Sequence, residues 1–368
     1  MGMAFVSFGF RFRVNAEAMN MVESMGNYTR HRTAPIIRQV IEDGGITYEV
    51  QYLPIVSGQS IANAYTRALA DIAVRRWLPI CEMCRRHNET GGFPKRPNID
   101  KNVEDSVDKR VAECVVEDVT GLMATEPKEK SGGKSSKKSG EKSSEGSGEE
   151  AGSGRALRRT SRIQFSHLIP DADSANHVPP MPQFHVRYGE KETQTIYNIE
   201  SASAIYTLVV NIDVDGIGKG VSITTSDREA RVEAALDALM LMLNGGYIGA
   251  KKSRYFPQME LLGAIAVVSN PYPFVVSPPK AKLNNDGALL PWYLEDTLRR
   301  ALEFKKIFNN ATLRLYYIDN EFNWIPSVNV GNDVKIEEVD NLNALIIKVK
   351  ETLNLNKKGQ TQGSTETK

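Results

Sequence analysis

Ala204-Ile-Tyr-Thr-Leu-Val-Val-Asn-Ile-Asp-Val-Asp215 is an apolar, β-branched run that predicts a long strand in a buried sheet. It ends in the glycine-rich turn Gly216-Ile-Gly-Lys-Gly220. A helix is expected next, because Thr225-Ser226-Asp227 offers an N-cap and apolar residues then recur at helical spacing. These residues are Val232, Leu236, Leu239, Met240 and Leu243. The apolar run Leu261–Val268 predicts a second strand, which gives the order strand, helix, strand.

A strand, a hairpin and a helix are predicted nearer the N-terminus. Residues 5–14 predict a strand, and residues 36–56 predict a hairpin that turns at Asp43-Gly44-Gly45. Ser57-Gly58 opens a helix, whose apolar stripe is Ile61, Tyr65, Ala68, Leu69 and Ile72. The opposite, polar stripe is Gln59, Asn63, Arg67 and Asp71. With a further helix near 289–308 and a strand near 312–318, the pattern indicates an α+β chain with an RRM-like (ferredoxin-like) core.

The loop Gly245–Phe256 lies between the predicted helix and the Leu261–Val268 strand. It combines three glycines with Lys251, Lys252 and Arg254, followed by two aromatic residues. This composition suits a phosphate backbone with bases stacked beside it. A Walker A motif is excluded because Gly249 is followed by Ala250 rather than by Gly-Lys-Ser/Thr. The loop therefore favours nucleic acid over ATP, and the simpler alternative is a helix C-cap followed by a solvated basic loop.

Two further basic clusters lie in segments without helical pattern. One is Arg30-His31-Arg32, and the other contains Arg158, Arg159 and Arg162. We expect both to line the same groove as the Gly245–Phe256 loop, although each taken singly is typical of a solvated surface. His185 lies in a strand pattern opposite its neighbours Phe184 and Val186. It either faces this groove or serves as a structural histidine.

Composition is that of an ordinary globular protein. The chain has 368 residues, 41% hydrophobic and 25% charged residues, and a net charge of +1. Near-neutrality excludes only a uniformly basic surface, since local patches govern phosphate contacts. No signal peptide and no apolar run of about 20 residues is evident, so a cytoplasmic location without membrane contact is expected.

The three cysteines are too few and odd in number for a secreted disulfide scaffold. Cys81, Cys84, His87 and Cys114 can together supply four zinc ligands. A second paired motif is missing, and the flanking Trp77-Leu-Pro-Ile indicates partly buried thiols. Buried structural cysteines are the default interpretation, so no metal or other cofactor is expected; zinc and a disulfide stay as alternatives.

Six stretches of the chain resemble a known protein family. They are Arg11-Phe-Arg-Val-Asn15, Gly26-Asn-Tyr-Thr-Arg-His-Arg-Thr-Ala-Pro35, Tyr52-Leu-Pro-Ile-Val-Ser-Gly58, Arg158-Arg-Thr-Ser-Arg-Ile163, Gln183-Phe-His-Val-Arg187 and Gly249-Ala-Lys-Lys-Ser-Arg254. In this order they resemble the backbone subunit of archaeal type I-A CRISPR surveillance complexes (Cascade), the Cas-seven/DevR branch of the RAMP superfamily. One departure is the Lys/Glu/Ser/Gly-rich insert between Gly121 and Arg158, where the family usually has a short Gly-rich loop.

The resemblance implies an RRM-like core with insertions and a non-catalytic subunit that polymerises helically along a CRISPR RNA for antiviral defence. It implies that the bases stay free to pair with target DNA. The expected partners are CRISPR RNA, copies of the chain, a Cas-five-type subunit and other Cascade proteins. The predicted RNA-binding residues are Arg30, His31, Arg32, Gln59, Asn63, Arg67, Arg158, Arg159, Arg162, His185, Lys251, Lys252 and Arg254. The alternative is a metal-independent RAMP endoribonuclease that uses His31 or His185 as general acid or base.

The residue patterns and the resemblance together predict how the chain is divided. Residues 1–79 and 156–275 form a discontinuous core, with a hairpin insertion at about 15–56, and residues 80–125 form a helical insertion. Residues 126–155 form a disordered loop that tolerates deletion. Residues 276–355 form an α/β extension, and residues 356–368 form a flexible tail.

Overall fold

The computed structural model describes residues 4–25, 28–42, 45–89, 95–100, 104–126, 156–175, 178–188, 194–284, 287–328 and 334–355. The loop expected at 126–155, apart from residue 126, and the tail expected at 356–368 lie outside these residues. Among the described helices, none combines the length and apolarity needed to cross a membrane.

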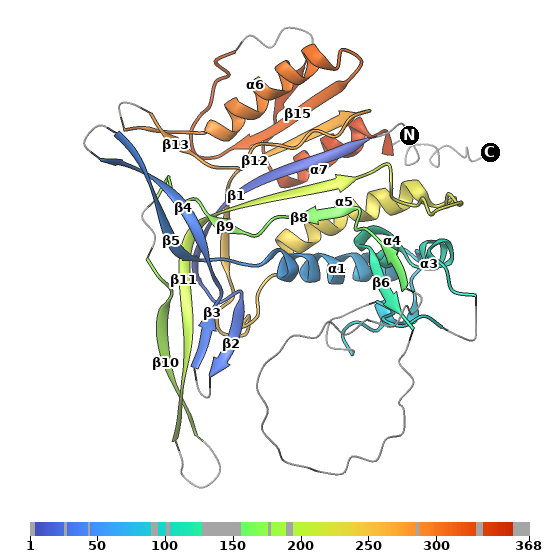
Figure 1. Ribbon diagram of the computed structural model, residues 1–368, viewed down its shortest axis with the longest axis horizontal. Coiled ribbons are helices and arrows are strands. Elements are labelled where there is room, and N and C mark those ends of the chain that lie inside the picture. Colours follow the sequence, from blue (N-terminus) through green and yellow to red (C-terminus); the bar gives the residue numbers. More distant parts are fainter. Residues whose placement is uncertain are drawn as a thin grey trace, which may run out of the picture.

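A large mixed sheet organises the described chain (Figure 1). Its central strands are β1 (Phe5–Glu17), β11 (Gln194–Asp213), β12 (Gln258–Asn270) and β15 (Thr312–Asp319). β1 lies antiparallel between β11 and β12, and β15 pairs antiparallel with the far edge of β12. The short strand β8 (Ile163–Phe165) pairs antiparallel with the end of β11. The expectation of a mixed helix–sheet chain is confirmed at this level.

Side chains alternate between the two faces of the sheet, as a strand period of two requires. On β1, Phe8, Phe10 and Phe12 face the larger core, which they share with α1 (Gly58–Arg75), α5 (Arg228–Asn244) and α7 (Leu342–Thr352). On β12, Ile265 and Val267 face the opposite side, where α6 (Trp292–Ile307) covers them. The sheet is therefore buried on both faces, with α6 alone on its side in Figure 1.

α1 and α5 begin where the sequence predicts, but their N-termini are capped differently. The Ser57 hydroxyl accepts a hydrogen bond from Ser60 N at 3.2 Å, as an N-cap side chain does. Asp227 occupies the N-cap position of α5 without a capping bond. Its carboxylate accepts from Arg231 Nε at 2.7 Å instead. The two helices pack together, and the Tyr65 hydroxyl of α1 donates to the Ala235 carbonyl of α5 at 2.9 Å.

Hairpins extend the sheet away from the helices. β4 (Thr33–Glu42) and β5 (Gly45–Pro54) form the hairpin expected there, with residues 43–44 outside the described part. β10 (Met181–Tyr188) pairs with the first half of β11, and that half also pairs with β3 (Tyr28–His31). β2 (Met21–Met25) lies beside β3. β9 (Ile169–Pro170) pairs with the middle of β11.

The region expected as a helical insertion is only partly helical. It contains α2 (Glu82–Arg85), α3 (Val107–Glu113) and α4 (Val115–Thr120), but ends in β6 (Leu122–Thr125), which pairs with β7 (Ala156–Arg159). The C-terminal part adds the short pair β13 (Lys282–Leu283) and β14 (Leu289–Leu290), together with β16 (Lys335–Glu338). β15 and β16 continue the main sheet rather than forming a sheet of their own, because β15 pairs directly with β12.

Candidate nucleic-acid interface

A cavity of about 280 Å³ lies between the N-terminal half of α1 and the loop that joins α5 to β12. Its lining residues are Met19, Gln59, Ser60, Asn63, Arg67, Tyr247, Gly249 and Ala250. Gln59, Asn63 and Arg67 are four residues apart on α1, so they share one face of the helix. The structure thus brings the predicted polar stripe of α1 and the predicted basic loop to one place.

Hydrogen bonds hold the loop against α1. Arg67 Nη2 donates to the Tyr247 carbonyl at 2.6 Å, and its guanidinium lies 5.9 Å from the centre of the Tyr247 ring. The Tyr247 hydroxyl donates to Asp71 Oδ2 at 2.5 Å. The loop also needs two glycines in the left-handed region, Gly246 with φ 67° and Gly249 with φ 120°.

Arg67 lines this cavity, and the cations of the basic loop lie next to its lining residues in sequence. No Asp or Glu is among the described residues that line it. Lys252 is half-buried and donates from Nζ to the Gly246 carbonyl at 2.8 Å. Burial, together with the nearby charge of Arg67, lowers the pKa of Lys252. Lys251 and Arg254 are exposed beside it. Cations that repel one another around a polar hollow favour an anionic ligand such as a phosphate.

Aromatic residues connect the loop to the β10–β11 hairpin. His185 of β10 shares a hydrogen bond of 2.5 Å between Nε2 and the Tyr255 hydroxyl. Its ring stacks on Tyr197 of β11, with centroids 5.2 Å apart and an angle of 22° between the planes. The Arg254 guanidinium donates to the Tyr197 hydroxyl. His185 is therefore partly exposed and lies next to the basic loop, as one of its two interpretations requires.

The Arg30–Arg32 cluster borders a second cavity, of about 510 Å³, which Tyr52, Pro179 and Glu200 also line. Arg30 and Arg32 are exposed. Two consecutive residues connect this cluster to the basic loop, since the Asn20 carbonyl accepts from Arg32 N at 2.8 Å and the Met19 carbonyl accepts from Ala250 N at 3.1 Å. Two of the three predicted clusters thus lie close together.

His31 is also among the residues around this second cavity, but its ring is enclosed by protein atoms. Its side chain is fully buried, with Nε2 2.8 Å from Glu17 Oε1. Nδ1 donates to the Arg32 carbonyl at 2.9 Å. Burial alone lowers the pKa of His31, but the hydrogen bond and the charge of Glu17 outweigh it, so the pKa lies above its ordinary value of 6.5. Both ring nitrogens are occupied, and His31 is a structural residue in this conformation.

The third cluster lies apart from the other two. Arg162 pairs with Asp213 at 2.9 Å, at the end of β11 opposite Tyr197. Arg159 is buried, with its guanidinium against the Asp118 carboxylate and 2.8 Å from the Lys219 carbonyl. Only Arg158 of the three is exposed. The expectation of one groove with three clusters is therefore corrected, because β11 separates this cluster from the basic loop.

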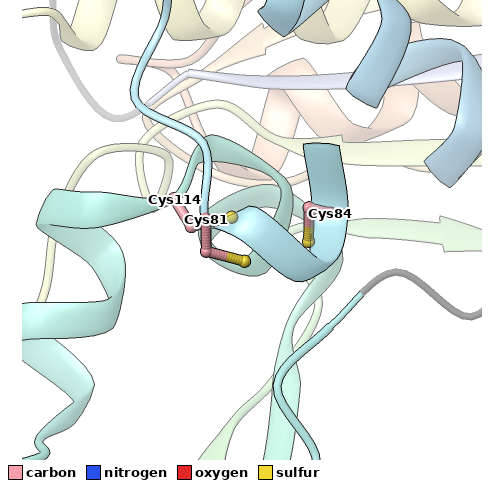
Figure 2. Close-up of side chains that lie close together, drawn as sticks. All are labelled: Cys81, Cys84 and Cys114. Carbon is pink, nitrogen blue, oxygen red and sulfur yellow. The ribbon is translucent and has the colours of Figure 1, made fainter. Parts of the chain in front are cut away.

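Three cysteine thiols form a separate cluster, shown in Figure 2. The Cys81, Cys84 and Cys114 sulfur atoms all lie within 4.8 Å of one another, and none is in a disulfide. His87, predicted as a fourth ligand, is not part of this group. Its Nε2 lies 2.8 Å from Asp71 Oδ1.

Some residues at the candidate site carry no strong signal in the sequence. Met19 and Asn20 act through their backbone carbonyls, which any residue type provides. Tyr197 lies in a strand pattern that the sequence does not connect with the loop. Tyr247 and Tyr255 belong to the predicted loop, and their aromatic character beside cations is the signal that points to them.

Comparison with known proteins agrees with the resemblance. A chain from Saccharolobus solfataricus, "CRISPR-associated aCascade subunit Cas7/Csa2 2", is 30% identical over 94% of this chain and 99% of its own length. A second chain from the same organism, "CRISPR-associated protein Cas7/Csa2 1", is 33% identical over 86% of this chain and 93% of its own length. A chain of the solved "CRISPR RNA-guided surveillance complex, pre-nicking" overlaps loosely, with a TM-score of 0.49 and 11% identity over 95% of this chain and 99% of that chain.

The sequence model of the family described as "CRISPR-associated negative auto-regulator DevR/Csa2" matches residues 8–286. This range includes most of β1 and all of α1, β11, α5 and β12, as well as the basic loop and the residues that line both cavities. The chain belongs to the DevR/Csa2 family of CRISPR-associated proteins.

Proposed function

We propose that this chain is a non-catalytic, CRISPR RNA-binding subunit that polymerises along the guide to form the backbone of a type I-A Cascade complex. The observation that carries the proposal is the cavity between α1 and the basic loop, where Arg67 lies among neutral polar side chains and no carboxylate is among the described lining residues. Membership in the DevR/Csa2 family and the Cascade subunit named among the relatives support it. A cytoplasmic location accompanies this role.

The proposed RNA path uses two kinds of contact. Lys251, Lys252 and Arg67 neutralise phosphates, and Gln59 and Asn63 add hydrogen bonds to phosphate or sugar. Arg30 and Arg32 continue the positive surface beyond Met19 and Asn20. The His185, Tyr197 and Tyr255 rings lie beside Arg254 and provide a stacking surface for an unpaired base or sugar. Such contacts do not depend on the RNA sequence. A subunit that binds guides of many different sequences requires contacts of this kind.

We infer that the RRM-like core is the unit β1–α1–β8–β11–α5–β12. These strands lie in the order β12, β1, β11, β8, each antiparallel to its neighbour, with α1 and α5 on one face. This arrangement agrees with a split β-α-β pair. The hairpins β4–β5 and β10–β11 project from it and expose apolar side chains, among them Tyr48, Tyr52 and Phe184. In this proposal they contact neighbouring copies or a Cas-five-type subunit, while the guide bases stay free for target DNA.

The test is RNA affinity as a function of salt concentration. Replacing Lys251, Lys252 and Arg254 by Ala is expected to weaken binding to every RNA sequence alike. It also flattens the salt dependence, with the slope falling by about 0.7 for each single-strand phosphate that the variant no longer neutralises. Because Lys252 and Arg254 also hold the loop, the single variant Lys251→Ala separates the removal of charge from a displaced loop.

Two variants serve as controls for these measurements. Arg299→Ala removes an exposed arginine from α6, on the other face of the sheet, and is expected to leave the slope unchanged. Arg158→Ala tests the distant third cluster, and a loss of affinity equal to that of the loop variants would return this cluster to the RNA path. Unchanged affinity and an unchanged slope in the triple variant would remove the loop from the site.

The endoribonuclease alternative keeps one candidate residue. His31 is buried against Glu17, whereas His185 is partly exposed and hydrogen-bonded to a tyrosine hydroxyl beside Arg254. Incubating the purified protein with repeat RNA in the presence of a chelator distinguishes the two functions. Intact RNA is the expected result. Defined cleavage that disappears in His185→Ala would instead support an enzyme.

A further inference from the structure

The cysteine cluster joins α2 to the junction of α3 and α4. Cys81 precedes α2 and Cys84 lies within it, whereas Cys114 lies at the junction of α3 and α4 (Figure 2). Close by, Val115 N donates to the Pro79 carbonyl at 2.8 Å. The three thiols thus lie where the segment that leaves α1 meets the α3–α4 pair. Cys84 and Cys114 are buried, and Cys81 is partly exposed.

The separation of the sulfur atoms matches a metal site more closely than a disulfide. All three lie within 4.8 Å of one another, and none is bonded to another. In tetrahedral zinc sites the Zn–S distance is about 2.3 Å, which places two thiolate sulfurs about 3.8 Å apart. A contraction of about 1 Å or less would complete such a triangle. Three mutually adjacent thiols also exceed what a single disulfide uses, because one would stay unpaired.

A basic side chain lies beside the thiol cluster. The ammonium of Lys95 interacts electrostatically with Cys84 and Cys114, and it donates to the Thr120 carbonyl at 3.1 Å. The backbone N–H of Cys84 hydrogen-bonds to the Cys81 sulfur, and the charge of Arg96 also acts on it. A divalent ion with three thiolates has one net negative charge, and the Lys95 ammonium balances it.

We propose that Cys81, Cys84 and Cys114 bind one Zn²⁺ ion through their thiolates, with a water molecule as the fourth ligand. Binding releases the thiol protons to solvent and changes no oxidation state. Thiolates are soft ligands, which favours zinc over magnesium or calcium. The ion stabilises the packing of α2 against the α3–α4 junction, on the side of the molecule away from the β10–β11 hairpin. This role is structural and independent of RNA binding.

The first experiment uses the intact wild-type chain. We expect about one zinc per chain by elemental analysis when the protein is purified without chelator. After removal of the metal, titration with Co²⁺ alone is expected to produce the intense d–d and thiolate charge-transfer bands of a tetrahedral site, and Zn²⁺ is expected to bleach them. The chain contains only three cysteines, so every thiol that reacts with a thiol reagent reports on this cluster. Zn²⁺ is expected to slow that reaction.

Variants assign the ligands. Loss of a residue that only supports a metal ligand weakens metal binding by about 10–100-fold. Cys84→Ser and Cys114→Ser each remove a ligand itself, so each is expected to weaken zinc binding by at least that factor. Glu82→Gln is the matched control, because Glu82 is exposed between Cys81 and Cys84 and is expected to keep full zinc content. His87→Gln is also expected to keep the metal, since His87 lies outside the group.

Three outcomes would overturn the proposal. The first is a wild-type chain that takes up neither Zn²⁺ nor Co²⁺ while all three thiols react freely. The second is a disulfide that leaves one reactive thiol under mild oxidation and persists in the presence of zinc. The third is another metal at the thiols after purification and reconstitution. These results come from the wild-type protein, so they hold even where a cysteine variant fails to fold.

Discussion

At the scale of single residues, burial separates basic side chains with the same sequence signal. Lys251 and Arg30 are exposed cations beside cavities, whereas His31 and Arg159 are enclosed by acidic or carbonyl oxygen atoms. A buried charge needs partners for its lost hydration. Glu17 provides this for His31 and also accepts from the Tyr206 hydroxyl at 2.7 Å, which ties β3 to the end of β1 and to β11.

The His31–Glu17 pair predicts a pH-dependent stability. The pKa of His31 is raised on folding, so its stabilisation is fully present below the unfolded pKa of about 6.5. The stabilisation is lost as the pH rises through the folded pKa. His31→Gln is therefore expected to lower the free energy of unfolding by about 1.5–3 kcal/mol in mildly acidic buffer and by less in alkaline buffer. Urea denaturation at both ends of this range measures the difference.

The second variant of this experiment removes the partner. In the Glu17→Gln background, the pH dependence of the His31→Gln effect is expected to disappear or to change sign, since the carboxylate that raises the pKa is gone while burial, which lowers the pKa, remains. A pH dependence of the same sign and equal size in both backgrounds would contradict the assignment of the effect to this pair.

At the scale of elements, the basic loop depends on its glycines as much as on its cations. Gly246 has φ 67°, and a Cβ atom there would lie 2.9 Å from the Phe256 ring. Because Gly246 has no side chain, the chain can reverse after α5 and bring Tyr247 under Arg67. Loop shape and loop charge are therefore separate requirements, and the single variant Lys251→Ala tests the charge alone.

Gly246→Ala is expected to weaken RNA binding without removing any charge. The left-handed backbone costs about 1–2 kcal/mol for a residue with a Cβ atom, and the contact with Phe256 displaces the loop as well. Gly287→Ala is the matched control, since Gly287 has φ 78° but no atom within 4 Å of the added Cβ. Both variants are expected to lose stability through the left-handed backbone, and only Gly246→Ala is expected to lose RNA affinity. Equal RNA affinity in the two variants would speak against a shaped site.

At the scale of the whole molecule, the insert between β6 and β7 is bounded by a paired ladder. Thr125 pairs with Ala156, so the two ends of the intervening segment are adjacent in the fold. The sequence of this segment has almost no apolar residues and cannot contribute a core. The ladder itself is held by Arg159, through Asp118 and the carbonyls around Gly216. None of these contacts involves the insert.

Deletion of residues 128–152 is accordingly expected to leave the fold and RNA binding intact. It retains residues 126–127 and 153–155, which are enough for a hairpin loop of three to five residues. A shorter loop has a smaller entropic cost of closure. The free energy of unfolding is therefore expected to stay equal or to rise by less than about 1–2 kcal/mol. Thermal denaturation and RNA titration check both points. A clear loss of guide binding would assign the insert a role in RNA contact.

Local patterns in the sequence predict the elements well where packing agrees with periodicity. The stripe of Ile61, Tyr65 and Leu69 is buried on α1, and the polar stripe of Gln59, Asn63 and Arg67 faces the cavity. The N-cap at Ser57 and the hairpin at residues 33–54 also follow local rules. β6 is missed because a four-residue strand has too few positions to display a period, and its partner β7 lies beyond the insert.

The sequence by itself determined the family, the mixed helix–sheet composition and the residues of the basic loop, because these depend on residue types at short spacing. Only the tertiary structure decided which clusters meet. Long-range strand pairing places Arg30 and Arg32 near the loop, and Arg162 at the other end of β11. It also decided that His31 and Arg159 are enclosed and that Cys81, Cys84 and Cys114 meet without His87. The physical reason is that burial and convergence depend on partners distant in the chain, which a local pattern does not identify.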